Sequence, residues 1–149
     1  MKEKSDSVII LPTFNEIGNI EITLKKIENL SNKFDVIVVD DNSPDGTGLY
    51  VEEAINSEKF NVNIKLITRK GKDGLGTAYI EGFKKSLELK YSYIFQLDCD
   101  GSHDPKKLED LLNELKNNNA EIAVGSRYIK GITVINWPLS RLLLSIFAN

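Results

Sequence analysis

Short runs of apolar residues recur along the chain, and each run is followed by a polar stretch that contains turn-forming residues. Continuous apolar runs of this length, without alternation of polar positions, are typical of strands covered on both faces of a sheet. The pattern predicts strands over residues 7–11, 34–40, 62–68, 91–98 and 120–126.

The segments between these runs carry apolar residues at helical spacing. In residues 15–30, for example, Ile20, Leu24, Ile27 and Leu30 recur every three or four positions. The pattern predicts helices over residues 15–30, 49–58 and 75–89, one over 105–118 that opens with Pro105, and one from about Pro138. Strands that alternate with helices predict an α/β fold with a mostly parallel, doubly wound, Rossmann-like sheet. We find no repeat or linker, so residues 1–149 are interpreted as one domain.

Polar residues and glycines follow the end of each predicted strand, in the loops PTFNE, DDNSPDG, TRKGKDG, DCDGS and GSRY. In open α/β sheets, ligands bind outside the carboxyl ends of the strands. The loops therefore predict a ligand site at that edge. Ordinary polar loops are the alternative for any one of them, but they explain the set of five less well.

Composition narrows the class of protein. A formal net charge of −3 argues against a protein that mainly coats nucleic acid. The single cysteine, Cys99, excludes an intramolecular disulfide and suits a reducing, cytoplasmic compartment. The apolar part of the N-terminus is too short for a signal peptide, and no stretch has the roughly 18 apolar residues of a spanning helix.

Two pairs of carboxylates lie in the predicted loops. Asp98 and Asp100 are suited to a divalent cation, because a nucleotide-bound Mg²⁺ typically takes one or two protein carboxylates plus phosphates. The alternative is that they cap the turn and the next helix. Asp40 and Asp41 are suited to hydrogen bonds with a base or a ribose. An Asx turn, with helix capping by nearby polar residues, is the alternative there.

Arg127 and Arg141 add possible phosphate-binding groups near the same edge, although a lone arginine is often only a surface charge. His103, the single histidine, is more often structural than a ligand in such a turn. No G-x-G-x-x-G stretch is present, so dinucleotide redox chemistry loses its main support. A catalytic serine or cysteine with a base and an orienting group is not visible.

An ordered set of motifs covers nearly the whole chain: VIILPTFNE, IVVDDNSPDGT, GLGTAYIEGF, LDCDGSHDP, GSRYIKG and NWPLSR. Together they resemble the family 2 glycosyltransferases with the GT-A fold. Within that family they are most similar to the dolichyl-phosphate and polyprenyl-phosphate mannosyltransferases. The resemblance implies inverting transfer of mannose from GDP-mannose to a polyprenyl phosphate, with Mg²⁺ or Mn²⁺ as cofactor.

The resemblance also implies roles for individual residues. The guanosine would be bound by Pro12, Phe14 and Glu16, with Val38 and Asp40 completing the nucleoside pocket. Ribose and diphosphate would lie along Asp98 and Cys99, and the metal would be held by Asp100, with Asp98 and a possible oxygen from Ser102. The acceptor phosphate would be bound by Arg127 and Arg141. Phe14 replaces a tyrosine, and Cys99 an alanine, that are common in relatives.

Catalytic domains of this family usually extend further than this chain, so we expect that part of the acceptor-side segment is missing. The apolar ending LSRLLLSIFAN suggests an interfacial helix and a peripheral location at the cytoplasmic membrane face, or a core helix that is cut short. Three other functions remain open: a donor-binding half-domain without transfer activity, another polyprenyl-phosphate hexosyltransferase, and a haloacid-dehalogenase-type phosphohydrolase. The last would use Asp98 as nucleophile but carries its motif after the first strand.

Overall fold

The structure, a computed structural model, describes residues 3–126 as alternating strands and helices around one parallel sheet. In chain order the elements are β1 (Ser7–Thr13), α1 (Ile20–Glu28), β2 (Asp35–Asp40), α2 (Thr47–Asn56), β3 (Ile64–Thr68), α3 (Leu75–Glu88), β4 (Tyr93–Gln96) and α4 (Lys107–Asn117). The four predicted strands before residue 100 and the four predicted helices before residue 120 are therefore all present, with shifted ends.

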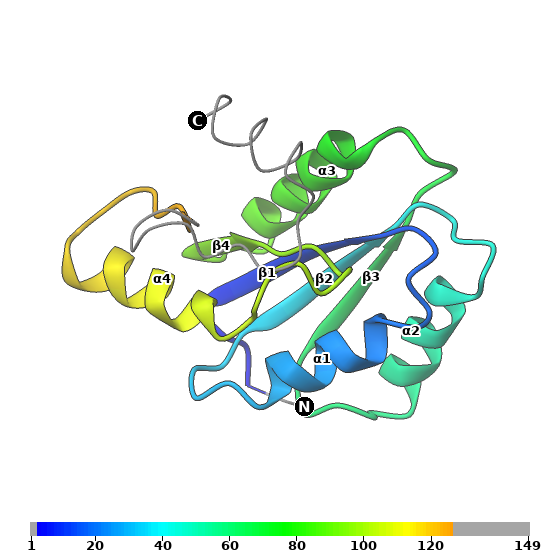
Figure 1. Cartoon of the computed structure of the whole chain (residues 1–149), viewed down its shortest axis with the longest axis horizontal. Helices are drawn as coiled ribbons and strands as arrows, with labels where there is room; N and C mark the ends of the chain where they lie inside the picture. Colours follow the sequence, from blue (N-terminus) through cyan, green and yellow to red (C-terminus); the bar gives the residue numbers. More distant parts are fainter. Residues whose placement is uncertain (1–2, 127–149) are drawn as a thin grey trace, which may run out of the picture.

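The strand order is β3-β2-β1-β4, and every neighbouring pair is parallel. The chain moves outward from β1 to β3 and then returns past β1 to place β4 on its other side (Figure 1). This reversal of the strand order between β1 and β4 is a topological switch point, the place where open α/β sheets bind ligands.

Helices cover both faces of the sheet (Figure 1). On one face, buried side chains of α1, α2 and α4 form a core with alternate residues of the strands, including Ile9, Leu11 and Val38. On the other face, Ala78 of α3 packs with Ile10 and its neighbours. Burial of β1 and β2 on both faces explains their continuous apolar sequence, and it confirms the doubly wound α/β prediction.

Helix α3 approaches the sheet closely because Gly82 faces Ile10 of β1. A Cβ built on Gly82 would lie 2.4 Å from Ile10 Cγ2, which is closer than real side chains come. Glycine at this position therefore permits the helix to pack against the central strand.

The predicted fifth strand over residues 120–126 is wrong: these residues form no strand in the structure. Ile122 and Val124 are 80% and 78% exposed. An apolar run becomes a strand only where a neighbouring strand can pair with it, and none of the described strands does so here. The predicted helix from Pro138 lies outside the described residues.

Candidate functional site

A cavity of about 260 Å³ lies at the carboxyl edge of the sheet. It is lined by Pro12, Thr13, Phe14, Glu16, Asp41, Lys72, Leu75, Ala78, Asp98, Cys99 and Asp100. These residues lie at the carboxyl ends of β1, β2, β3 and β4 or in the segments that follow them, so four of the five strand-end loops singled out in the sequence converge on one site. The fifth loop, GSRY, adds none of its described residues to the lining, and its last two residues lie outside the described part of the chain. Its position at the β1–β4 switch point is where ligands bind in open α/β sheets.

Pro12 explains why the cavity opens between β1 and β4. Pairing of β1 with β4 reaches Ile10 and Gln96, and the last bond runs from the Leu97 N–H to the Ile10 carbonyl. Residues two apart in a strand face the same neighbour, so Pro12 turns its nitrogen toward β4 as well. Proline has no N–H to continue the ladder there. The two strands therefore part beyond this point.

Asp98 is held beside this opening by one neighbour on α3 and by another on its own β4–α4 loop. The Tyr79 hydroxyl on α3 donates to Asp98 Oδ1 at 2.7 Å. On the other side, His103 Nδ1 lies 3.6 Å from Asp98 Oδ2 and accepts the Asp98 backbone N–H at 3.4 Å. Burial, and then the Asp98 carboxylate, raise the pKa of Tyr79, so the phenol stays a donor at neutral pH. His103 is thus a local partner of Asp98.

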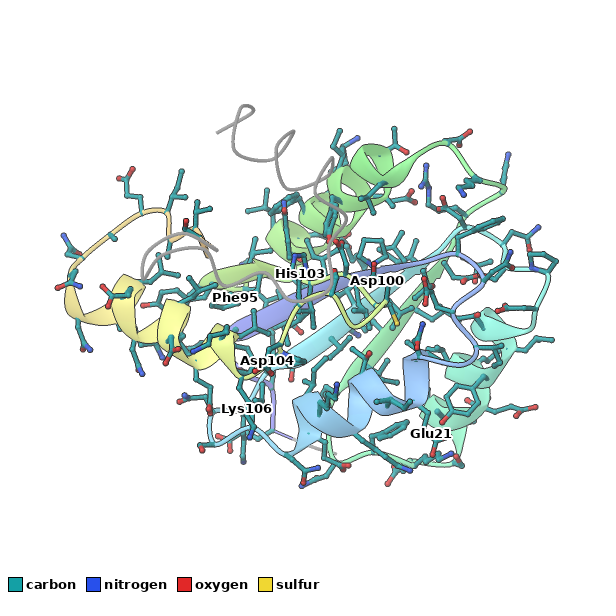
Figure 2. All side chains as sticks on the ribbon, in the orientation of Figure 1. Glu21, Phe95, Asp100, His103, Asp104 and Lys106 are labelled. Carbon is teal, nitrogen blue, oxygen red and sulfur yellow. The ribbon has the colours of Figure 1, made fainter. Side chains whose placement is uncertain are left out.

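Asp100 lies two residues further along the β4–α4 loop, where Figure 2 shows it near His103. Its Oδ1 accepts the backbone N–H of Ser102 at 2.8 Å, and this bond is the main reason its pKa is lowered. The carboxylate is therefore ionised at neutral pH. The turn-capping alternative is correct for one oxygen, yet the same side chain also lines the cavity. Ser102 is exposed and does not line it.

Cys99 lies between the two aspartates but has a different environment. It is 2% exposed, and burial raises the pKa of its thiol to about 12. A thiol with such a pKa is neutral and a poor nucleophile at physiological pH. Cys99 therefore contributes to the wall of the cavity, and the structure supports no covalent role for it.

Phe14 and Glu16 reach the cavity from the β1–α1 loop, and Lys72 reaches it from the β3–α3 loop. The Lys72 ammonium lies 4.2 Å from the centre of the Phe14 ring, a cation–π distance. Glu16 Oε2 accepts a hydrogen bond from Asn19 at 2.8 Å. Of the residues that the structure describes around the cavity, Lys72 is the one with a positive charge.

Val38 and Asp40 do not line the cavity. Val38 is fully buried in the core between the sheet and the α1 face. Asp40 Oδ1 accepts the hydroxyls of Thr13, at 2.8 Å, and Ser43, at 2.6 Å, and its Oδ2 accepts the Ser43 backbone N–H at 2.9 Å. The carboxylate therefore ties β1 to the β2–α2 turn, as the Asx-turn alternative expects.

Asp41 is neutralised by Arg69, which sequence reasoning left without a role. Arg69 Nη1 contacts Asp41 Oδ1 at 2.6 Å, and both residues are buried. The same guanidinium donates to the Thr77 hydroxyl at 2.6 Å and lies 3.2 Å from Glu81. This network connects the end of β2 to α3 and fixes the base of the loop that carries Lys72.

Tyr79 and Lys72 were also missed. Lys72 belongs to TRKGKDG, a loop noted only for its position after a strand. Tyr79 lies inside a helix, and nothing local indicates that it reaches a carboxylate in the loop after β4. Arg127 and Arg141, the predicted acceptor-phosphate residues, lie outside the described residues.

Within residues 3–126 no cluster of three or more acidic, histidine or cysteine side chains could hold a metal ion unaided. Two ionisable carboxylates on one loop, Asp98 and Asp100, do fit a Mg²⁺ or Mn²⁺ ion whose other ligands are phosphate and water oxygens. The residues present are thus compatible with a metal that arrives with a nucleotide.

A larger hollow of about 450 Å³ lies at the opposite, amino end of the strands. Its buried carboxylate, Asp35, accepts hydrogen bonds from the Tyr91 hydroxyl, at 2.8 Å, and from the Asn63 amide, at 3.0 Å. The Asp35 carboxylate is thus hydrogen-bonded to neighbouring side chains of the same hollow, so the larger volume alone does not make this hollow the functional site. We take the smaller cavity at the carboxyl edge as the candidate site.

These features define the class of protein: an α/β domain of the GT-A-like type with its site at the carboxyl edge of the sheet. The chain belongs to glycosyl transferase family 2, whose family model matches residues 8–148. The fold is shared with S. aureus TarS, at a TM-score of 0.67 and 22% identity over 94% of this chain and 24% of that one.

Three relatives carry names that describe polyprenyl-phosphate chemistry. The polyprenol monophosphomannose synthase of Mycolicibacterium smegmatis is 40% identical over 96% of this chain and 53% of its own. The undecaprenyl-phosphate mannosyltransferase of Micrococcus luteus is 40% identical over 91% and 54%. The dolichol-phosphate mannosyltransferase of Pyrococcus furiosus is 39% identical over 92% and 37%. The chain thus spans about half the length of the first two. Asp98 follows the fourth strand, whereas the phosphohydrolase alternative carries its motif after the first.

Proposed function

We propose that the chain transfers mannose from GDP-mannose to the phosphate of a polyprenol, with inversion at the anomeric carbon. The observation that carries the proposal is the gathering of Phe14, Asp98 and Asp100 in one cavity at the switch point. Two relatives that are 40% identical, one named a polyprenol monophosphomannose synthase and the other an undecaprenyl-phosphate mannosyltransferase, support it further.

In this proposal the nucleoside binds between the β1–α1 loop and the β4–α4 loop. Pro12 and the Phe14 ring form its apolar wall, and Glu16 accepts hydrogen bonds from the base. Val38 supports that wall from the core, and Asp40 fixes Thr13 and Ser43 beneath it. The ribose and diphosphate lie along Asp98 and Cys99.

Asp100 and Asp98 would hold Mg²⁺ or Mn²⁺, with Ser102 as a possible further oxygen. The ion, when bound with the nucleotide, stabilises the charge that develops on the GDP leaving group. Tyr79 keeps one oxygen of Asp98 in a fixed direction. Crowding of two carboxylates is favourable in this arrangement, because a cation–diphosphate unit supplies opposite charge beside them.

Lys72 is proposed to pair with the diphosphate. It is exposed, it lines the cavity, and in the described part of the chain its ammonium contacts only the face of Phe14. Arg127 and Arg141 are proposed to bind the acceptor phosphate. Since that phosphate is already anionic, its oxygen needs little help from a general base. The neutral Cys99 thiol is consistent with direct transfer without a covalent enzyme intermediate.

The acceptor's lipid tail implies work at a membrane surface, and we propose peripheral association at the cytoplasmic face. None of the helices within residues 3–126 has the length and apolar character needed to cross a bilayer. Nucleic acid is not expected as a partner, given the net charge of −3.

A second candidate is donor binding without transfer. It is favoured by the finding that this chain spans only about half the length of the first two relatives. A transfer assay separates the two candidates. GDP-[¹⁴C]mannose, Mn²⁺ and a short polyprenyl phosphate are incubated with the chain, and the label is counted in the organic extract.

Label in the lipid fraction that is lost in Asp100→Ala supports transfer. No label, with GDP-mannose still bound, identifies the donor-binding module. A panel of GDP- and UDP-linked sugars in the same assay tests the donor: preference for another sugar would contradict the mannose assignment and favour a different polyprenyl-phosphate hexosyltransferase.

A further inference from the structure

Backbone amides of the β1–α1 loop are bound by side chains of the β2–α2 turn, which lies beside it (Figure 1). The N–H of Asn15 donates to the Ser43 hydroxyl, that of Glu16 to the Thr47 hydroxyl and that of Ile17 to Asp45 Oδ2, each at 3.0 Å. Three consecutive amides are therefore held by three different side chains of one turn.

The turn itself is fixed from within. Asp45 Oδ1 accepts both the hydroxyl and the backbone N–H of Thr47, at 2.6 and 3.0 Å. Ser43 donates its hydroxyl to Asp40 at 2.6 Å, so its oxygen is oriented to accept from Asn15. Thr47 is fully buried at the start of α2. The three acceptors thus form a rigid edge against which the loop is placed.

The loop does not need this edge to satisfy its amides. Asn15 and Ile17 are exposed, so water would serve their N–H groups if the turn were absent. What the edge adds is a single conformation, including a left-handed backbone at Asn15 with φ of 61°. Such conformations persist where the surrounding structure determines them. The residues between and beside these amides, Phe14 and Glu16, line the cavity.

We propose that Ser43, Asp45 and Thr47 are positioning residues for the nucleoside: they preorganise the 14–17 loop so that Phe14 and Glu16 are already placed to receive it. The inference rests on the proposed function, since it takes the occupant of the cavity to be a nucleotide. None of the three lines the cavity, so their effect passes through the loop backbone. A preorganised loop binds more tightly because less conformational freedom is lost on binding.

The test compares affinities for GDP, guanosine and Mn²⁺-pyrophosphate by titration calorimetry. Asp45→Ala is expected to lower the affinities for GDP and guanosine by about tenfold, the factor produced by loss of one hydrogen bond to a charged group. The affinity for Mn²⁺-pyrophosphate should not change. Thr47→Val is expected to behave in the same way, while Thr47→Ser keeps the hydroxyl and restores the affinity.

Glu109→Ala is the matched control. Glu109 Oε1 also accepts two backbone amides of another loop, Ser31 at 2.7 Å and Asn32 at 3.0 Å, but it lies on α4 away from the cavity lining. It should leave all three affinities unchanged. The positioning role is overturned if Asp45→Ala lowers the affinity for Mn²⁺-pyrophosphate as much as the affinity for GDP, or if it leaves the affinity for GDP unchanged. Absence of GDP binding in the unaltered chain instead contradicts the proposed function itself.

Discussion

Replacing Arg69 with methionine tests whether the buried pair beneath the site is structural. The substitution keeps an aliphatic side chain but leaves the Asp41 carboxylate without its cation. Asp41 is only 6% exposed, so water cannot replace that cation. It also removes the donor to Thr77 and the contact with Glu81. Removing one partner of a buried ion pair costs about 3–5 kcal/mol, because the remaining charge has lost both water and its counterion.

For a chain of this length that loss corresponds to a melting temperature lower by roughly 6–20 °C. Urea unfolding followed by circular dichroism gives the free energy directly. Lys70→Met is the control, since Lys70 is the neighbouring cation and is exposed. Adding Asp41→Asn to the Arg69 variant should recover part of the loss. A loss below about 1 kcal/mol for Arg69→Met alone, the size of an exposed pair, would refute the reasoning.

Three further substitutions have defined outcomes. Gly82→Ala forces a methyl group to within 2.4 Å of Ile10, and such overpacking costs about 1–3 kcal/mol of folding stability. This cost should exceed the gain of about 1 kcal/mol from the higher helix propensity of alanine, so urea unfolding should show a less stable variant, and a more stable one would contradict this packing. A hydrogen bond from Lys25 is the chief cause that lowers the pKa of Glu21 to about 2, so the stabilisation from its carboxylate is present above pH ~4.5 and is lost as the pH falls toward 2. The melting temperatures of Glu21→Gln and of the unaltered chain should therefore converge in that window, and a difference that stays constant with pH would argue against this ion pair. Tyr79→Phe frees Asp98 Oδ1 and should weaken Mn²⁺-GDP binding several-fold with an unchanged melting temperature, whereas unchanged affinity would remove the orienting role.

The doubly wound α/β fold followed from the sequence because strands buried on both faces are continuous in apolar residues. Residues 7–13 and 35–40 of this chain show that pattern, and they form the two fully buried strands. Residues 120–126 have similar composition but form no strand, because an apolar run does not specify whether a neighbouring strand is available.

Within the site, the sequence located the loops better than the contacts. Asp98 and Asp100 were predictable from their place after a strand. The turn after β4 determines that one oxygen of Asp100 accepts the Ser102 amide while the same side chain lines the cavity, and the sequence did not reveal this. Asp40 was assigned to the nucleoside pocket, yet its oxygens are taken by Thr13 and Ser43, which come from different segments of the chain.

Tyr79 and Lys72 were beyond sequence reasoning for a related cause. Each meets its partner across elements, Tyr79 from α3 to Asp98 and Lys72 from the β3–α3 loop to Phe14. Such contacts depend on how α3 crosses the sheet. That crossing depends in turn on the close approach at Gly82, which no periodicity reveals.

The central claim is that Asp100 helps to hold a divalent ion against a nucleotide diphosphate, and calorimetric titration of GDP with and without Mn²⁺ tests it most directly. The account predicts that Mn²⁺ raises the affinity of the unaltered chain for GDP, and that Asp100→Ala removes this increase while guanosine binding is retained. Equal affinities with and without Mn²⁺, or an increase that survives in Asp100→Ala, would contradict it.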